Sequence, residues 1–130
     1  MKRLVLTACG GLLLASCQEE GRLHATQRPD GQIEFSASYQ PVGDQPCINS
    51  ISVMHDEGGR RVEDWYASRQ DPSLCRDRIV YGRAGPGFRT GAPPRPLVPN
   101  QHYEVSVNGS GLAVGGTFRL TDAGLEFVEL

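Results

Sequence analysis

Apolar and polar residues alternate with a period of two along several short segments of this chain. In the clearest case Tyr103, Val105 and Val107 share one face, and the polar residues between them share the other. The same alternation runs through residues 31–38, after a Pro-Asp-Gly turn signal. A period of two is typical of a strand with one buried face, so we expect strands in both segments.

Weaker alternation predicts the remaining strands, at residues 23–25, 47–55, 61–67, 75–81, 112–120 and 125–130. Turn signals rich in glycine, asparagine and aspartate separate them, for example at residues 56–59 and 108–111. The chain has no convincing long helix. About seven short strands at near-regular spacing are typical of an all-β protein, so we expect a sandwich or barrel.

Two places depart from a regular strand. Val62 and Trp65 fall on opposite faces of their segment, and a β-bulge between them would reconcile the pattern. We expect Trp65 in the core and its neighbours Glu63 and Asp64 on the solvent face. Gly115-Gly116 predicts a second bulge or bend.

Residues 82–99 predict a long irregular connection, because four glycines and five prolines surround the single aromatic residue Phe88. Ordered loops of this length are often functional. Phe88 with Arg83 and Arg89 is the candidate contact site for a partner, since aromatic residues and arginine dominate interface hot spots. The alternative is that Phe88 packs the loop onto the sandwich.

The first residues have the plan of an export signal. Lys2 and Arg3 precede an apolar run, residues 4–14, which as a helix would span roughly 17 Å against a bilayer core of about 30 Å. Such a run is typical of a secretory signal rather than a membrane span. It ends in Leu14-Ala15-Ser16-Cys17, which resembles the lipobox of bacterial lipoprotein precursors. A plain signal peptide is the alternative.

The resemblance implies that Cys17 becomes the first residue of the mature protein and carries the lipid. We expect a signal peptide at residues 1–16, a lipid anchor and tether at 17–29 and the β domain at 30–130. Gln18 after the cysteine, rather than aspartate, implies an outer-membrane lipoprotein with its domain facing the periplasm. The chain as a whole is similar to small uncharacterised lipoproteins of Gram-negative bacteria.

Cys47 and Cys75 are the pair that remains once Cys9 leaves with the signal and Cys17 is lipidated. In an oxidising compartment they predict a disulfide. A zinc site is the alternative, but neither cysteine has a nearby cysteine or histidine to complete the ligand set.

A second resemblance concerns the start of the clearest strand. Leu97, Pro99, Tyr103 and Val105 match the pattern Leu-x-Pro-x-x-x-Tyr-x-Val, which is similar to the entry into strand F of fibronectin type III domains. In those domains the tyrosine hydroxyl bonds to the backbone a few residues upstream, the tyrosine corner. The resemblance implies an Ig/fibronectin-III-like sandwich, with Tyr103 as that tyrosine.

Motifs for chemistry are sparse. His55-Asp56-Glu57 lacks the spacing that places two ligands on one face, so we expect a solvated turn there and no metal or cofactor. The arginines interleave with acidic residues, which argues against nucleic-acid binding. We therefore expect no enzyme but a binding or envelope-assembly module, attached to the membrane through Cys17, whose protein partner the sequence does not identify. The alternative is an envelope-anchored inhibitor of a lysozyme or protease.

Overall fold

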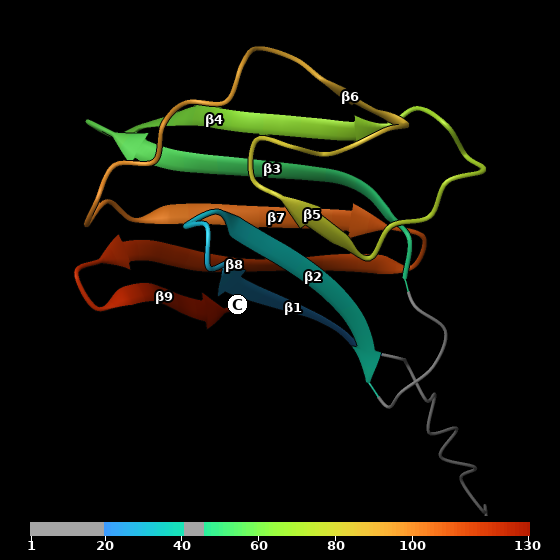
Figure 1. Ribbon diagram of the computed structural model, residues 1–130, viewed down its shortest axis with the longest axis horizontal. Coiled ribbons are helices and arrows are strands. Elements are labelled where there is room, and N and C mark those ends of the chain that lie inside the picture. The colour runs from blue at the N-terminus through green and yellow to red at the C-terminus, as the bar shows by residue number, and fades with distance from the viewer. Residues whose placement is uncertain (1–19, 41–45) are drawn as a thin grey trace, which may run out of the picture.

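The computed structural model of the 130-residue chain describes residues 20–40 and 46–130 (Figure 1). The signal segment and Cys17 lie outside these residues. Nine strands make up the described fold: β1 Glu20–Gln27, β2 Ile33–Gln40, β3 Ile48–Glu57, β4 Arg60–Arg69, β5 Arg78–Val80, β6 Phe88–Thr90, β7 Tyr103–Gly109, β8 Leu112–Thr121 and β9 Gly124–Glu129.

The strands form two antiparallel sheets. The small sheet has the order β1-β2-β5, and the large sheet has the order β6-β4-β3-β7-β8-β9. The two sheets face each other across a shared core, and β6 and β9 are the two edge strands of the large sheet. The predicted all-β sandwich is therefore confirmed.

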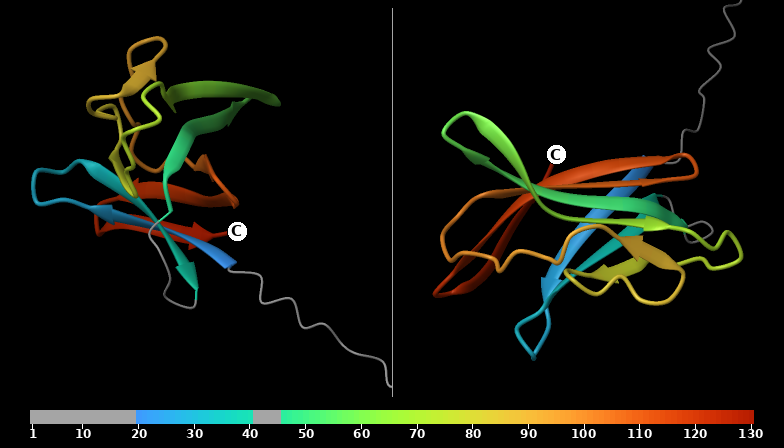
Figure 2. Two further views of the ribbon diagram at one scale, coloured as in Figure 1. Left: turned by 90° about the vertical axis from the view of Figure 1, so that its right-hand side faces the viewer. Right: turned by 90° about the horizontal axis from the view of Figure 1, so that it is seen from above.

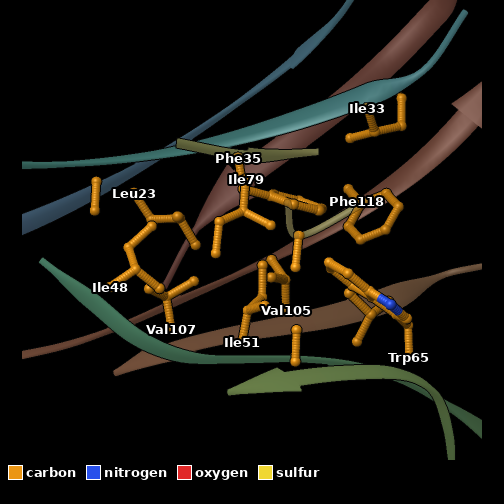
Figure 3. Packing of buried hydrophobic residues seen from close by; sticks show 14 of the residues in the cluster. Leu23, Ile33, Phe35, Ile48, Ile51, Trp65, Ile79, Val105, Val107 and Phe118 are labelled. Carbon is orange, nitrogen blue, oxygen red and sulfur yellow. The ribbon is translucent and has the colours of Figure 1, made fainter. Parts of the chain in front are cut away.

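The core lies between the two sheets (Figure 3). Phe35 and Ile79 from the small sheet face Ile51, Val105 and Val107 from the large sheet, and all five are buried. Trp65 and Phe118 lie at one end of the same cluster, which confirms Trp65 as a core residue. The alternation along each strand thus turns one apolar face of each sheet toward the other.

The tether expected over residues 17–29 is wrong for its described part. Glu20–Gln27 pair along their whole length with β2, and Leu23 is fully buried in the core. The weak alternation around Leu23 was the relevant signal, and polar residues dilute it because β1 is an edge strand with one solvent face.

β1 and β9 close one side of the sandwich without pairing as strands. The Leu23 amide donates to one Glu129 carboxylate oxygen at 2.7 Å, and Arg22 bonds to the other at 3.0 Å. One side chain therefore satisfies an edge amide of the small sheet from the last strand of the large sheet. Such covering protects an edge from pairing with another chain.

Two predicted boundaries differ from the structure in the middle of the chain. The strand expected at 75–81 is confined to Arg78–Val80. The connection at 82–99 contains a short strand, β6, which pairs with residues 67–69 of β4. The prolines and glycines around β6 keep it to three residues, because proline cannot donate to a ladder.

The prediction of a bulge at Gly115-Gly116 is wrong. Both glycines pair in unbroken register with β7, at Ser106 and Val105 respectively. A Cβ atom on Gly116 would lie 2.4 Å from the Phe127 ring on β9. The glycine is there because an aromatic ring of the neighbouring strand covers it.

The disulfide between Cys47 and Cys75 is confirmed, with the two Cα atoms 4.8 Å apart. The bonded sulfurs leave no thiolate pair for the alternative zinc site. Beside the bridge, the Ile48 amide donates to the Arg76 carbonyl at 2.8 Å. The bridge therefore fixes the start of β3, in the large sheet, to the segment that leads into β5, in the small one.

Candidate functional site

A β-bulge in the β3–β4 hairpin determines which side chains are buried at one end of the sandwich. Val53 pairs with Trp65 but Met54 pairs with Glu63, so Asp64 is the extra residue. Asp64 and Trp65 are therefore buried in succession, which a regular strand does not allow. Such a bulge reconciles the positions of Val62 and Trp65, although the sequence alone did not establish it. The hairpin curves away from the other strands of the large sheet (Figure 2), as the stronger twist at a bulge would cause.

The bulge turns Asp64 toward His55. His55 Nδ1 lies 2.7 Å from Asp64 Oδ2, and the exposed fractions of the two side chains are 12% and 4%. A carboxylate only accepts hydrogen bonds, so Nδ1 is the donor. The predictions of a solvated turn at His55 and a solvent face at Asp64 are both wrong. His55 lies on β3 and continues the inward face of Ile51 and Val53, and at the bulge Asp64 is buried together with Trp65.

The second ring nitrogen of His55 faces the surface. Nε2 lies 3.6 Å from a carboxylate oxygen of Glu57, whose side chain is 70% exposed. The edge of the ring packs on Tyr103, with ring centres 5.9 Å apart. A small hollow of about 120 Å³ opens beside His55, and His102 and Glu104 also line it. No group of three or more metal-ligating side chains lies together in the part of the chain that the structure describes.

Three hydrogen bonds fasten the proline-rich segment 93–99 to the sandwich. The Arg95 amide donates to the Asp64 carbonyl at 3.0 Å, and the Tyr81 hydroxyl donates to the Arg95 carbonyl at 2.7 Å. The Val98 amide donates to the Tyr103 hydroxyl oxygen at 2.7 Å. This last bond is a tyrosine corner, as the match at Leu97–Val105 predicted. The segment is therefore a fixed wall rather than a loose loop.

A cleft of about 370 Å³ lies between this wall and the turn that joins β1 to β2. We call it the tip cleft. Four segments line it, contributing Gly31, Gln32, Ile33, Tyr81, Gly82, Arg83, Pro94, Arg95, Pro96, Leu97 and Leu120. The volume falls within the range of about 300–1,000 Å³ that is typical of ligand sites.

The lining of the tip cleft combines apolar surface with positive charge. Ile33, Leu97 and Leu120 supply aliphatic side chains, and the two charged residues, Arg83 and Arg95, are both exposed arginines. Arg83 makes a long hydrogen bond of 3.4 Å to the neutral Gln32 side chain. Among the residues described, neither arginine forms an ion pair.

Tyr81 stays in its neutral form at the inner wall of the tip cleft. Burial raises the pKa of Tyr81 well above its usual value, and the negative charge of Asp64 raises it further. Its hydroxyl therefore keeps the proton that it donates to the Arg95 carbonyl. The Tyr81 ring also contacts Trp65, with ring centres 5.3 Å apart, so Tyr81 links the proline-rich wall to the core.

The structure does not bring the three expected contact residues together. Arg83 lines the tip cleft, whereas Phe88 and Arg89 lie on β6. Phe88 is half-buried against the core, and Arg89 is exposed and paired with Ser68. The geometry of Phe88 agrees with the alternative that it packs the connection onto the sandwich. Arg95 was missed, and its place among four prolines was the available signal.

The tip cleft and the start of β1 lie at opposite ends of the β1–β2 hairpin. Glu20 pairs with Gln40 at one end, and the turn that contributes Gly31 and Gln32 is at the other. From Glu20 to Gln27 the strand spans about 23 Å at ~3.3 Å per residue. In Figure 1 the start of β1 lies at the lower right, and the turn lies toward the left.

Comparison with known proteins identifies no relative: no family model, curated protein or solved structure matches the chain. Within residues 20–40 and 46–130, no helix is long and apolar enough to cross a membrane.

Proposed function

We propose that this chain is a lipid-anchored binding protein of the bacterial outer membrane, without catalytic activity, that holds a partner in the tip cleft. The lipobox-like stretch Leu14-Ala15-Ser16-Cys17 supports the anchor. The lipid on Cys17 would attach the chain three residues before β1 begins.

The position of the tip cleft is the observation that carries the proposal. In sequence the lipid would be attached three residues before Glu20, and the tip cleft lies at the far end of the β1–β2 hairpin from Glu20. Anchoring therefore leaves the cleft facing away from the membrane that holds the chain. A site in that position is accessible to proteins of the periplasm and to structures on the side of the periplasm opposite the anchoring membrane.

The tip cleft is already formed in the free chain. Its proline-rich wall is held by hydrogen bonds from Tyr81 and Arg95, and Gly82 packs against Pro94. A preformed site loses little conformational entropy on binding, so more of the contact energy contributes to affinity. The cleft lining has no serine, cysteine, histidine or carboxylate side chain, which supports binding rather than acid–base or nucleophilic chemistry.

Site-specific crosslinking in intact cells tests the proposal. A photoreactive residue replaces Pro96, at the exposed rim of the tip cleft, or Ser110, at the exposed β7–β8 turn. Ser110 is the matched control because its carbonyl accepts a bond from Tyr39 at the Glu20 end of the hairpin. We expect a discrete protein adduct from position 96 and none from position 110.

The same cells carrying Cys17→Ser test the anchor. We expect the variant to lose lipid labelling and to leave the membrane fraction. Equal adducts from both positions would contradict the tip cleft as the binding site, and unchanged membrane partitioning of Cys17→Ser would contradict the anchor. A hydrolase captured at position 96 would favour the inhibitor alternative, and an activity assay on that enzyme would test it.

A further inference from the structure

The charge and shape of the tip cleft restrict what it can hold. Its two charged lining residues, Arg83 and Arg95, are both positive, and neither has a carboxylate partner within the described chain. Arginine presents a planar fork of donors that matches a carboxylate with two parallel hydrogen bonds. A ligand that supplies a carboxylate would therefore find unused donors at the rim.

The apolar part of the lining lies beside this charge. Leu97 and Leu120 are half-buried and Ile33 is buried, so their side chains form a floor that already excludes much of the water. An aliphatic side chain placed on this floor would bury apolar surface away from water, which favours binding. The matching ligand therefore combines an apolar side chain with a carboxylate close to it.

We infer that the tip cleft binds an extended peptide segment of a partner protein in which an apolar side chain is followed by a carboxylate. The inference rests on the proposed function and names its ligand class. Pro94 and Pro96 have no amide N–H, and the Arg95 amide between them already donates to the Asp64 carbonyl, so specificity comes from the arginines and the floor rather than from strand addition. Under the proposed function the membrane anchor would precede Glu20, at the end of the β1–β2 hairpin opposite the tip cleft, which favours a protein segment over a membrane lipid.

Two sources can supply the carboxylate: the C-terminus of the partner or an aspartate or glutamate side chain. Four probes separate them by calorimetry on the full chain extracted in detergent. The first pair is acetyl-Gly-Gly-Leu-Leu with a free C-terminus and its C-terminal amide. The second pair is the amidated peptides acetyl-Gly-Gly-Leu-Asp and acetyl-Gly-Gly-Leu-Asn.

We expect one carboxylate peptide to bind and its neutral counterpart to bind at least about tenfold more weakly, because a charge-assisted hydrogen bond is lost. Arg83→Gln and Arg95→Gln should each weaken binding by a similar factor. Arg89→Gln is the matched control, since Arg89 is an exposed arginine on β6 outside the cleft, and it should leave the affinity unchanged. Binding should also weaken as salt is raised, because the pairs are exposed.

Each other outcome overturns the inference. Equal binding of charged and neutral peptides would remove the role of the arginines, as would an equal loss in Arg89→Gln. Binding of palmitate in place of all four peptides would assign the cleft to a fatty acid. Failure of every probe while position 96 still yields its adduct in cells would reject this ligand class and leave the proposed function standing.

Discussion

His55 Nδ1 and Asp64 Oδ2 lie 2.7 Å apart because a single extra residue in β4 turns the Asp64 side chain inward. Asp64 is 5% exposed and is the one charged residue among the buried residues described. A buried carboxylate is costly unless a partner compensates it. Its carbonyl also accepts the Arg95 amide, so the same residue joins the bulge to the wall of the tip cleft.

We predict that His55→Ala lowers the free energy of unfolding by about 3 kcal/mol, because it leaves the Asp64 carboxylate buried without its donor. Urea denaturation measures the loss. Glu57→Ala is the control, since Glu57 is exposed and 3.6 Å from the ring, and it should cost less than about 0.5 kcal/mol. The double variant His55→Ala with Asp64→Ala should lose less than the sum of the two single losses, and strict additivity would contradict the pairing.

A second prediction concerns the pH dependence that Tyr81 contributes. Burial, with the charge of Asp64, raises the pKa of Tyr81 above its unfolded value of 10.0. The folded state therefore holds this proton more tightly, so the stabilisation is complete below pH 10 and is lost as pH rises above it. Tyr81→Phe should lower stability by about 1 kcal/mol at neutral pH, through loss of the bond to the Arg95 carbonyl.

The same variant should lose less stability between about pH 9 and pH 11 than the natural chain. Tyr103, whose pKa is also raised chiefly by burial, will leave a residual slope. Urea denaturation across this range measures both slopes. Identical slopes in the two proteins would rule out Tyr81 as the source.

Glu129 should make the fold sensitive to acid. Burial opposes its ionisation, but the hydrogen bonds from Arg22 and the Leu23 amide outweigh burial, and the net result is a lowered pKa. The stabilisation is present above the unfolded value of 4.5 and is lost as pH falls through the folded value. Glu129→Gln should therefore cost about 1 kcal/mol at neutral pH and flatten the loss of stability in acid.

The control is Glu126→Gln. Glu126 lies on β9 with Glu129 but is more exposed, and the substitution breaks its ion pair with Arg119 on β8. Its cost should be under about 0.5 kcal/mol. Equal effects of the two variants would mean that the link between β1 and β9 adds nothing beyond an ordinary surface ion pair.

The disulfide should supply a large share of the stability. It closes a loop with a sequence separation of 28 residues, and the chain-entropy relation gives about 3.6 kcal/mol for a loop of that size. We expect Cys47→Ala with Cys75→Ala, or reduction of the natural chain, to lower the free energy of unfolding by about this amount. Thermal denaturation with and without reductant measures it, and a change below about 1 kcal/mol would contradict the prediction.

The sequence predicted the sheets best where alternation is strict. The alternation of Tyr103, Val105 and Val107 predicted β7 and its inward face. Val62 and Trp65 showed that the hairpin strand β4 is irregular, but they did not establish the bulge. The burial of Asp64 could not be read from the sequence, because it depends on which residue of β4 is the extra one. The pairing of β4 with β3 determines which residue is the extra one. From its polarity alone, an aspartate is expected on the solvent face.

The tip cleft could not be predicted, because it combines segments far apart in the chain. Gly31, Tyr81, Arg95 and Leu120 meet only when the two sheets pack and the tyrosine corner fixes the wall. Arg83 was expected to act with Phe88 because they are close in sequence. In the structure Arg83 lines the tip cleft, whereas Phe88 lies on β6.

Amide chemical shifts measured during titration with the tightest of the four peptides test the central claim most directly. We predict that the largest changes fall on Gly31, Gly82 and Leu97, which surround the tip cleft, and that they vanish in Arg83→Gln with Arg95→Gln. Changes concentrated on Phe88 and Arg89, or around His55, would place the binding surface elsewhere and contradict the account.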